Sequence, residues 1–459
     1  MMKTYTSNKK ENSINFVILL AFLTAPYFYI RYGGFDFSKG TSFSLVDLFL
    51  VSAFAFVAIF FIKNHALLKV DRQCRDMLIL GSIIIFLCLL SGIIAPLLYK
   101  TNIRWPSLLS GASQYAFIFI GFPLLAFFFL SVNKLRTAIR FIALGYLFPM
   151  LLTLLMSPVN FFSPLREFFY CANRALGTYG NANSFAVVLV ITLPFYIYLV
   201  ATEKGFWQKI GYVGVITLLP CLFLSASFSG IIVLSSVIFF NLLLMVFWKN
   251  NPLRQAIKET VSRFALIFSL FAGLCVALSY FSPFIVEKVS SRIFLKTVYV
   301  PQEQAPTSQN PQEQALAPQS EMVQSALTRM ELNYRALKLI QERNGGLFFG
   351  HGLRQTPLRP DFNFGGIGLD VHLVYLLLWV EGGLILVLAF IGYFGLLFRN
   401  CLKLSKKYPH EALVVGNSIL ALMLFCFFLP HVYLRYFWVP LLLAFVTTKE
   451  HTSISESVR

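Results

Sequence analysis

Three arginines and one histidine in the second half of the chain have the chemistry to act on a phosphorylated substrate. Arg174, Arg292 and Arg329 each carry a planar guanidinium, which stays charged and binds phosphate oxygens through paired hydrogen bonds. His372 carries an imidazole, whose pKa near neutrality suits it to accept a proton from a hydroxyl group. In a transfer reaction, such arginines would stabilise charge on a departing phosphate while the histidine served as base.

Short polar motifs beside apolar segments accompany these residues. The segment 174–183, RALGTYGNAN, precedes one apolar block, and the segment 225–230, SASFSG, separates two others. Further along come GHG at 350–352, then His372 at the start of an apolar block, and EGG at 381–383 inside that block.

Metal-dependent chemistry is not indicated by the carboxylates. The sequence has neither D-x-D nor H-E-x-x-H, and Asp361 and Asp370 are nine residues apart in a glycine-rich segment, which is a poor metal signature. We therefore expect no metal and no other cofactor.

The elements that position these residues are apolar blocks. Hydrophobic residues make up 57% of the chain and charged residues only 13%, and the apolar residues gather in blocks of about 20, enough to cross a bilayer. The expected fold is an all-α polytopic membrane protein of about twelve helices. Spans are predicted near residues 14–31, 44–62, 77–98, 113–131, 138–156, 183–201, 209–225, 230–248, 264–284, 372–398, 412–429 and 432–447. The pair at 209–225 and 230–248 is either a tight hairpin or one re-entrant unit.

The basic residues predict the orientation. With a cytoplasmic N-terminus, the inner segments hold 22 of the 38 basic residues, and the short outer segments hold seven. This bias follows the positive-inside rule and places both termini in the cytoplasm. The net charge of +18 is thereby explained by loops between spans, and we expect no nucleic-acid partner.

The chain divides into helices one to nine (1–284), a long outer loop (285–371) and the last three helices with a cytoplasmic tail (372–459). The loop repeats PQEQA at 301–305 and 311–315, a composition typical of flexible sequence. After the repeat, apolar residues recur at helical spacing over about 321–342 and predict an amphipathic helix.

The motifs, in this order and on this side of the membrane, resemble the O-antigen ligase and Wzy-type polymerase superfamily of membrane glycosyltransferases, over roughly residues 174–394. The family has an arginine followed by Gly and by G-N-x-N, and this pattern is matched at 174–183. It also has an arginine that leads a helix ending in G-x-G, matched by Arg329 and by 350–352. Finally it has a histidine at the start of a span followed by E-x-G, matched by His372 and by 381–383. Two positions depart from the pattern: Phe228 stands where the family often has arginine, and Leu373 where it often has asparagine.

The resemblance implies a bacterial inner-membrane enzyme with a large periplasmic loop. It would transfer a glycan, without a metal, from an undecaprenyl-diphosphate carrier to an acceptor, most simply the lipid A–core of lipopolysaccharide. It implies His372 as the catalytic base and Arg174, Arg329 and, more weakly, Arg292 as diphosphate ligands. The alternatives are a repeat-unit polymerase, a protein O-oligosaccharyltransferase and a lipid-linked glycan transporter.

Each candidate also has a purely structural interpretation. Arg174 would anchor the end of a helix at the lipid headgroups, and Arg329 would lie on a solvated helix face. His372 would only form a hydrogen bond at the start of a helix. The same reasoning makes Glu381, with its two following glycines, a brace for helix packing. His351, between two glycines, is either a second candidate base or, as we favour, a turn residue. Asn181 and Asn183 would cap the helix that follows them.

Overall fold

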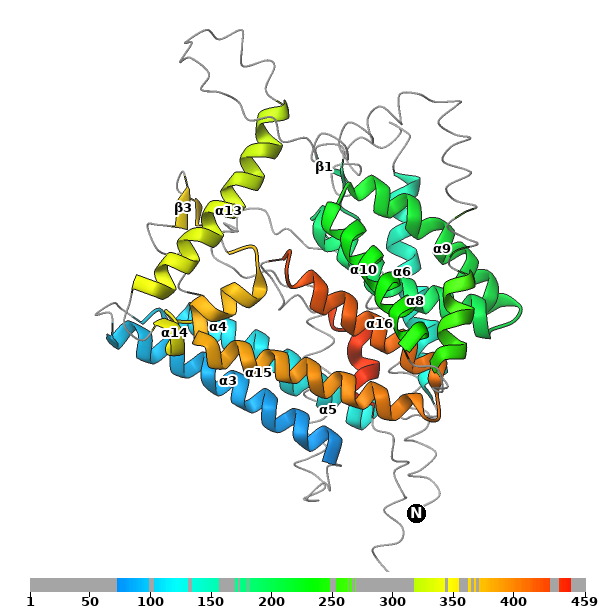
Figure 1. The fold of residues 1–459 in the computed structure, drawn as a ribbon, viewed down its shortest axis with the longest axis horizontal. Coiled ribbons are helices and arrows are strands. Elements are labelled where there is room, and N and C mark those ends of the chain that lie inside the picture. The colour runs from blue at the N-terminus through cyan, green and yellow to red at the C-terminus, as the bar shows by residue number, and fades with distance from the viewer. Residues whose placement is uncertain are drawn as a thin grey trace, which may run out of the picture.

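The computed structural model describes thirteen segments of the chain and the single residues 265 and 269. The segments are 72–98, 103–130, 134–156, 170–171, 174–179, 181–247, 253–263, 318–342, 346–354, 362–364, 367–368, 371–429 and 437–446. Helices dominate this part of the chain (Figure 1).

Within these segments, the helices of the first half are α3 (Arg72–Leu98), α4 (Trp105–Ala116), the π-helix η2 (Phe117–Gly121), α5 (Phe122–Phe129), α6 (Leu135–Leu155), α8 (Ala182–Thr202), α9 (Phe206–Ser225) and α10 (Phe228–Phe247). Those of the second half are α13 (Pro318–Glu342), α14 (Gly346–Phe349), α15 (Val374–Ser405), α16 (Pro409–Phe425) and the 3₁₀ helix η9 (Pro440–Phe445). Two short antiparallel hairpins pair β1 (Tyr170–Cys171) with β2 (Arg174–Ala175) and β3 (Asn363–Phe364) with β4 (Ile367–Gly368).

Seven helices of the described chain are long and apolar enough to cross a membrane: α3, the continuous run 105–127, α6, α8, α9, α10 and α15. Each overlaps a predicted span, as does the shorter apolar helix α16, although the run 105–127 begins eight residues before its predicted span and α15 ends seven residues after its own. The predicted spans 14–31 and 44–62, and nearly all of 264–284, lie outside the described residues. The membrane fold is thus supported, and the count of twelve stays a prediction.

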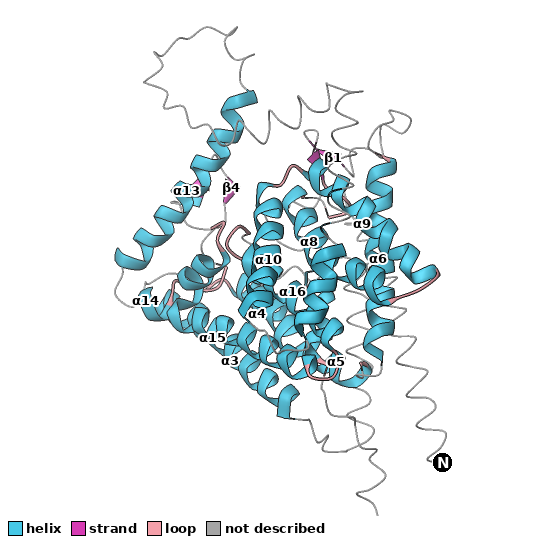
Figure 2. Ribbon diagram, turned by 45° about the vertical axis from the view of Figure 1, so that its right-hand side comes forward, coloured by secondary structure: helices cyan, strands magenta, loops and turns pink. Residues whose placement is uncertain are grey.

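Helix α8 lies at the centre of one half of the molecule. In its most apolar stretch 89% of the residues are buried, because its side chains are apolar on every face. Helices α6, α9, α10 and α16 pack around it (Figures 1 and 2). In the other half α3 lies along α4, η2 and α15, and α16 joins the halves because it contacts both α8 and α15.

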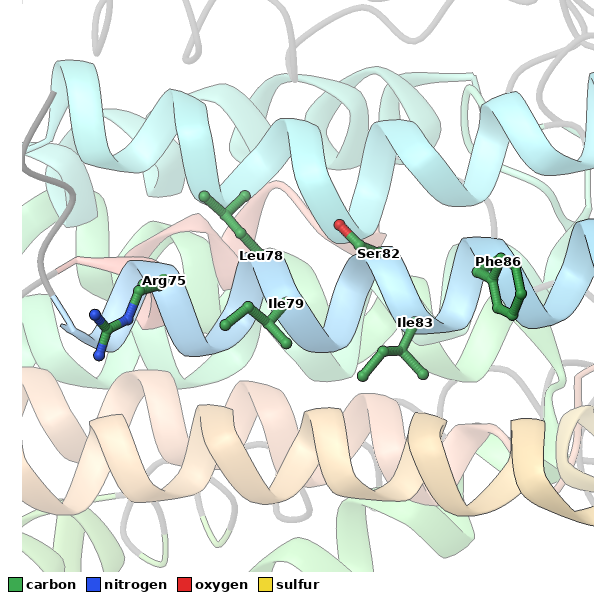
Figure 3. A pocket seen from close by; sticks show the side chains of 6 residues that line it. All are labelled: Arg75, Leu78, Ile79, Ser82, Ile83 and Phe86. Carbon is green, nitrogen blue, oxygen red and sulfur yellow. The ribbon is translucent and has the colours of Figure 1, made fainter. Parts of the chain in front are cut away.

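The face of α3 that points away from the other described helices is largely exposed. Figure 3 shows a shallow groove along this face, where Ile79, Ile83 and Phe86 are exposed and Arg75 lies near one end. Such an apolar face is what a membrane-spanning helix presents to lipid or to a neighbouring helix.

The predicted last span, 432–447, differs from the structure in its described part. Residues 440–445 form a single 3₁₀ helix, which is too short to cross the hydrocarbon region. This segment is buried against α5, α15 and α16, and Trp438 packs edge-on to Phe119. Irregular backbone is tolerated at membrane depth where protein buries it. An apolar sequence alone does not distinguish such a buried irregular segment from a membrane-spanning helix.

The open question about residues 209–248 is decided in favour of a hairpin. Helices α9 and α10 are separate and of 20 residues each. Ala226, in the left-handed conformation (φ 47°), and Ser227 connect them.

Basic residues collect at one end of the helices. At that end Arg399 binds Asp76 (Nη2–Oδ2 2.8 Å), and Arg136 and Arg140 both bind the buried carboxylate of Glu203 (2.5 Å each). The polar motifs from 174–183 and 225–230 lie at the opposite end, which we call the outer end.

Candidate functional site

Two polar motifs of the sequence meet where α8 begins, α9 ends and α10 begins. We call this group the rim cluster; its members are Arg174, Asn181, Asn183, Ser225, Ser227 and Ser229. The helix hairpin brings Ser225, Ser227 and Ser229 to the end of the bundle, and the β1–β2 hairpin brings Arg174 to the same place.

Arg174 is half-buried and holds the hairpin against the end of α9. Its Nε donates to the carbonyl of Ser225 (3.0 Å), and its Nη2 donates to the carbonyl of Ala226 (3.5 Å) and to Oδ1 of Asn183 (3.1 Å). The carbonyls at a helix C-terminus carry partial negative charge, which favours a cation there. The structure therefore places a charged guanidinium in a defined orientation at the outer end.

The two asparagines of the motif have different tasks. Asn181 is the N-cap of α8, because its side chain accepts from the backbone N–H groups of Asn183 (2.8 Å) and Ser184 (3.3 Å). The predicted cap is thus confirmed at Asn181. The side chain of Asn183 instead links two elements, since its Oδ1 accepts from Arg174 and from the hydroxyl of Ser227 (3.1 Å).

The start of α10 completes the rim cluster. The hydroxyl of Ser227 lies 3.0 Å from that of Ser229 and accepts from the backbone N–H of Gly230 (3.4 Å). Phe228, which stands where the resembling family often has arginine, is the first residue of α10 and is 43% exposed. The N-termini of α8 and α10 bring partial positive charge to this end, and Phe228 adds none.

A second meeting of motifs occurs at α14 and α15. We call it the interlock; it consists of Gly350–Gly352 packed on Glu381–Gly383. Gly383 (φ 79°, ψ 174°) interrupts the helical conformation of α15. The carbonyls of Val380 and Glu381 instead accept from the N–H groups of His351 (2.6 Å) and Gly352 (3.0 Å).

Close packing in the interlock requires glycine. A Cβ on Gly350 would come within 2.6 Å of the backbone of Glu381, and one on Gly383 would overlap the carbonyl of Phe348. The carbonyl of Glu381 also accepts from the hydroxyl of Ser91 on α3. The prediction that Glu381 braces helix packing is confirmed, and of its two glycines Gly383 is the one that allows the close approach of another element.

His351 is a buried turn residue, as the structural interpretation predicted. Its imidazole Nε2 lies 3.1 Å from the carbonyl of Leu339, so the ring ties the turn after α14 to α13. Its burial and this contact give it a structural role.

Arg354 and Gln114 were not singled out by the sequence analysis. The backbone N–H of Arg354 donates to Oε1 of Glu381 (2.8 Å), and its Nη2 donates to Oε1 of Gln114 on α4 (2.5 Å). Arg354 is also one of two non-glycine residues in the described chain with positive φ (56°). The available signal was an arginine two positions after the G-x-G motif.

Arg329 and His372 lie on elements that pack against one another. Apolar residues of α13, among them Leu332 and Ala336, form a buried contact with Val371 and with Leu376 on α15. Arg329 is half-buried on α13, and this burial lowers the pKa of its guanidinium below its usual range. His372, partly buried, follows Val371 directly and precedes α15 by two residues.

The site residues fall into two regions of the described chain. Arg174 belongs to the rim cluster, whereas Arg329 and His372 belong to the α13–α15 packing. Both views show α13 on the side of α3 and α15, and β1 on the side of α8, α9 and α10 (Figures 1 and 2). Convergence of the three residues on one substrate stays a prediction, and Arg292 lies outside the described residues.

Within the described residues, His, Cys, Asp and Glu side chains form no group of three that could hold a metal ion. No protein-family model matches the sequence, and no curated protein gives a significant match to it.

Proposed function

We propose that this protein is a membrane glycosyltransferase that moves a glycan from an undecaprenyl-diphosphate carrier to an acceptor at the periplasmic face of the bacterial inner membrane. The form we favour is O-antigen ligation to lipid A–core. The rim cluster carries the proposal, because Arg174 is held by Asn183 and two α9 carbonyls beside the N-termini of α8 and α10. An oriented arginine with two helix N-termini is an arrangement that attracts phosphate.

The rim cluster suits a lipid-linked donor in its position as well as its charge. A polyprenyl diphosphate buries its chain in the bilayer and keeps its phosphates at the surface, beside the ends of spanning helices. Arg174 lies at such an end, between a strand hairpin and three helices long and apolar enough to span. Its guanidinium would stabilise the charge that develops on the diphosphate as it leaves.

In the proposed reaction the acceptor hydroxyl oxygen attacks the anomeric carbon of the glycan. The bond from that carbon to the phosphate oxygen breaks, and undecaprenyl diphosphate leaves with the bonding electrons. His372 takes the hydroxyl proton, a role that suits an imidazole near neutral pH. Arg329 and Arg292 are proposed as additional diphosphate ligands. A phosphate paired with Arg329 would offset part of the free-energy cost of burying its charged guanidinium.

The first experiment is deletion of the gene followed by gel analysis of lipopolysaccharide. Loss of all O-antigen from the core, with polymer still on the carrier, supports ligation. Core that carries a single repeat unit supports the polymerase alternative. Unchanged lipopolysaccharide contradicts both and directs attention to a protein acceptor or to transport.

The second experiment tests the enzyme against the transporter. Helix α15 is discontinuous at Gly383, and discontinuous helices occur in transporters, so this alternative merits its own measurement. His372→Ala should bind donor normally and form no product, because the base acts on the acceptor. His410→Ala, at the opposite end of the helices beside Glu259 (3.8 Å), is the matched control and should keep activity. If the His372→Ala variant forms product in the same amount as the wild type, His372 is not the catalytic base.

A further inference from the structure

The connection between α8 and α9 lies at the level of the lipid headgroups. Helices α8 and α9 have 21 and 20 residues, so each is roughly 30 Å long. This length matches the hydrocarbon core, which places both ends of each helix at a membrane surface. Residues 203–205 join the two helices at the basic end, where Glu203 binds Arg136 and Arg140 of α6. The start of α6 therefore lies at the same level.

Positive charge exceeds negative charge at this place. Glu203 supplies one carboxylate, and four cations lie beside it at the starts of α6 and α9: Arg136, Arg140, Lys204 and Lys209. The neighbouring Arg263, which donates to the end of α8, and Glu411, which accepts from Tyr198 of α8, are one of each sign. Four cations against one carboxylate leave a surplus of three positive charges.

The two lysines are directed away from this carboxylate. Lys204 and Lys209 are exposed, and their ammonium groups form no hydrogen bond or ion pair with a described residue. Arg136 binds Glu203 with one edge of its guanidinium, through Nε and Nη2, and its side chain is still 53% exposed. Most of the surplus charge is thus accessible at the surface.

The helix ends add to this positive charge. Helices α6 and α9 pack against each other and both begin here, and the N-terminus of a helix carries partial positive charge that favours acidic residues. Neither helix has an acidic residue in its first turn, and no described side chain caps either of them. The cations and the two N-termini therefore repel one another unless an anion lies beside them. A phosphate group supplies such an anion and accepts from ammonium groups.

Aromatic side chains beside the cations indicate that this anion belongs to a lipid. Phe206, the first residue of α9, is 62% exposed, and its ring packs against Trp207 (centroids 5.3 Å apart). Trp207 also packs against Phe141 of α6, and Cζ of Arg140 lies 5.6 Å from the centre of its ring. Tryptophan and basic residues at the end of a spanning helix are typical of a membrane interface. Phe206 offers an apolar contact that an acyl chain can use and a soluble anion cannot.

We propose that this surface, which we call the α6–α9 corner (Arg136, Lys204, Phe206, Trp207 and Lys209), binds an anionic glycerophospholipid in the leaflet at the basic end. The two lysines bind the phosphate, Arg136 adds charge, and Phe206 contacts an acyl chain near the glycerol. The charge bias of the loops assigns this leaflet to the cytoplasm. The corner lies at the opposite end of the helices from the rim cluster, so the inference does not depend on the proposed transfer reaction.

The fluorescence of Trp207 gives a local measurement on the full-length protein in bilayers. Phosphatidylcholine with acyl chains brominated near the glycerol quenches a tryptophan that it contacts, and unbrominated phosphatidylglycerol that displaces it relieves the quenching. The signal of Trp207 is the difference between each protein and the same protein carrying Trp207→Phe. One basic residue near a membrane surface corresponds to a roughly fivefold preference for anionic lipid. Lys204→Gln together with Lys209→Gln should therefore lower the preference for phosphatidylglycerol over phosphatidylcholine by at least about fivefold.

The control removes the same charge from the same end of the molecule. Arg72 and Arg75 are exposed on α3, in the half that α3, α4 and α15 form. Arg72→Gln together with Arg75→Gln should leave the preference measured at Trp207 within about twofold of the wild type, because salt screens distant charges. All four substitutions replace exposed side chains, so both double variants should fold.

Three results would overturn the inference. The first is an unchanged preference in the double lysine variant, or an equal loss in the control. The second is a Trp207 that brominated lipid does not quench, which would mean that the corner does not face the bilayer. The third concerns the source of the phosphate: if soluble glycerol 3-phosphate at the same concentration as phosphatidylglycerol lowers the preference as much as the lysine substitutions do, the ligand is a soluble phosphate and not a lipid.

Discussion

Gly383→Ala tests whether the interlock holds α14 against α15. The native backbone (φ 79°, ψ 174°) lies in a region that is essentially restricted to glycine, and forcing alanine into it costs about 1–3 kcal/mol. The new Cβ would also overlap the carbonyl of Phe348, so α14 must shift. A shift breaks the bonds from the N–H groups of His351 and Gly352 to α15, which contribute about 1 kcal/mol each.

These terms together predict a loss of about 4 kcal/mol in the free energy of unfolding. In a thermal scan of the protein in detergent, the unfolding entropy of a chain of 459 residues, about 1 kcal/mol/K, converts this loss to a melting temperature about 4 °C below the wild type. A second readout is local: once released, the turn should be cut faster by trypsin after Arg354.

Gly395→Ala is the matched control on the same helix. Gly395 has helical backbone, and a Cβ there meets nothing within 4 Å. Alanine should therefore stabilise α15 by about 0.5–1 kcal/mol. A Gly383→Ala protein that melts within about 1 °C of the wild type and resists trypsin equally would refute the interlock as a source of stability.

Three further predictions follow from the contacts. Asn181→Ala should lower stability by about 1 kcal/mol through loss of the α8 cap, whereas Asn183→Ala should mainly weaken donor binding because Arg174 loses its side-chain acceptor; equal effects of both on donor binding would contradict this division. Burial raises the pKa of Glu203, but hydrogen bonds from two arginines outweigh it and hold the pKa below the ordinary 4.5; the stability from this group is present above that value and is lost as the pH falls through the lowered pKa. Melting curves at decreasing pH should therefore fall more steeply below pH 4.5 for the wild type than for Glu203→Gln, and parallel curves would argue against the linkage. His351→Ala should lower the melting temperature and speed tryptic cleavage in α13, because the ring no longer meets the carbonyl of Leu339; unchanged cleavage would contradict its structural role.

Much of the described architecture could be predicted from sequence because it depends on local physics. Apolar blocks of spanning length predicted α3, α5, α6, α8, α9, α10 and α15, and three- and four-residue spacing predicted α13. The predicted span 113–131 missed most of α4, which begins at Trp105. The helix cap at Asn181 could also be predicted from local sequence, because the N–H groups that its side chain accepts from are two and three residues away. The 3₁₀ helix η9 escaped prediction because its conformation depends on burial by α5, α15 and α16.

For the site, the sequence alone determined which residue types lie at the outer end and that their motifs border the spans. It did not determine which motifs meet. Helices such as α8 are apolar on every face, so no periodicity marks the face that contacts a given neighbour.

Only the tertiary structure placed Arg174 on Asn183, Gly352 on Glu381, and Arg354 on Gln114, 240 residues away in sequence. The reason is physical: polar groups near a bilayer must find partners within the protein, and helix packing decides which partners come within reach.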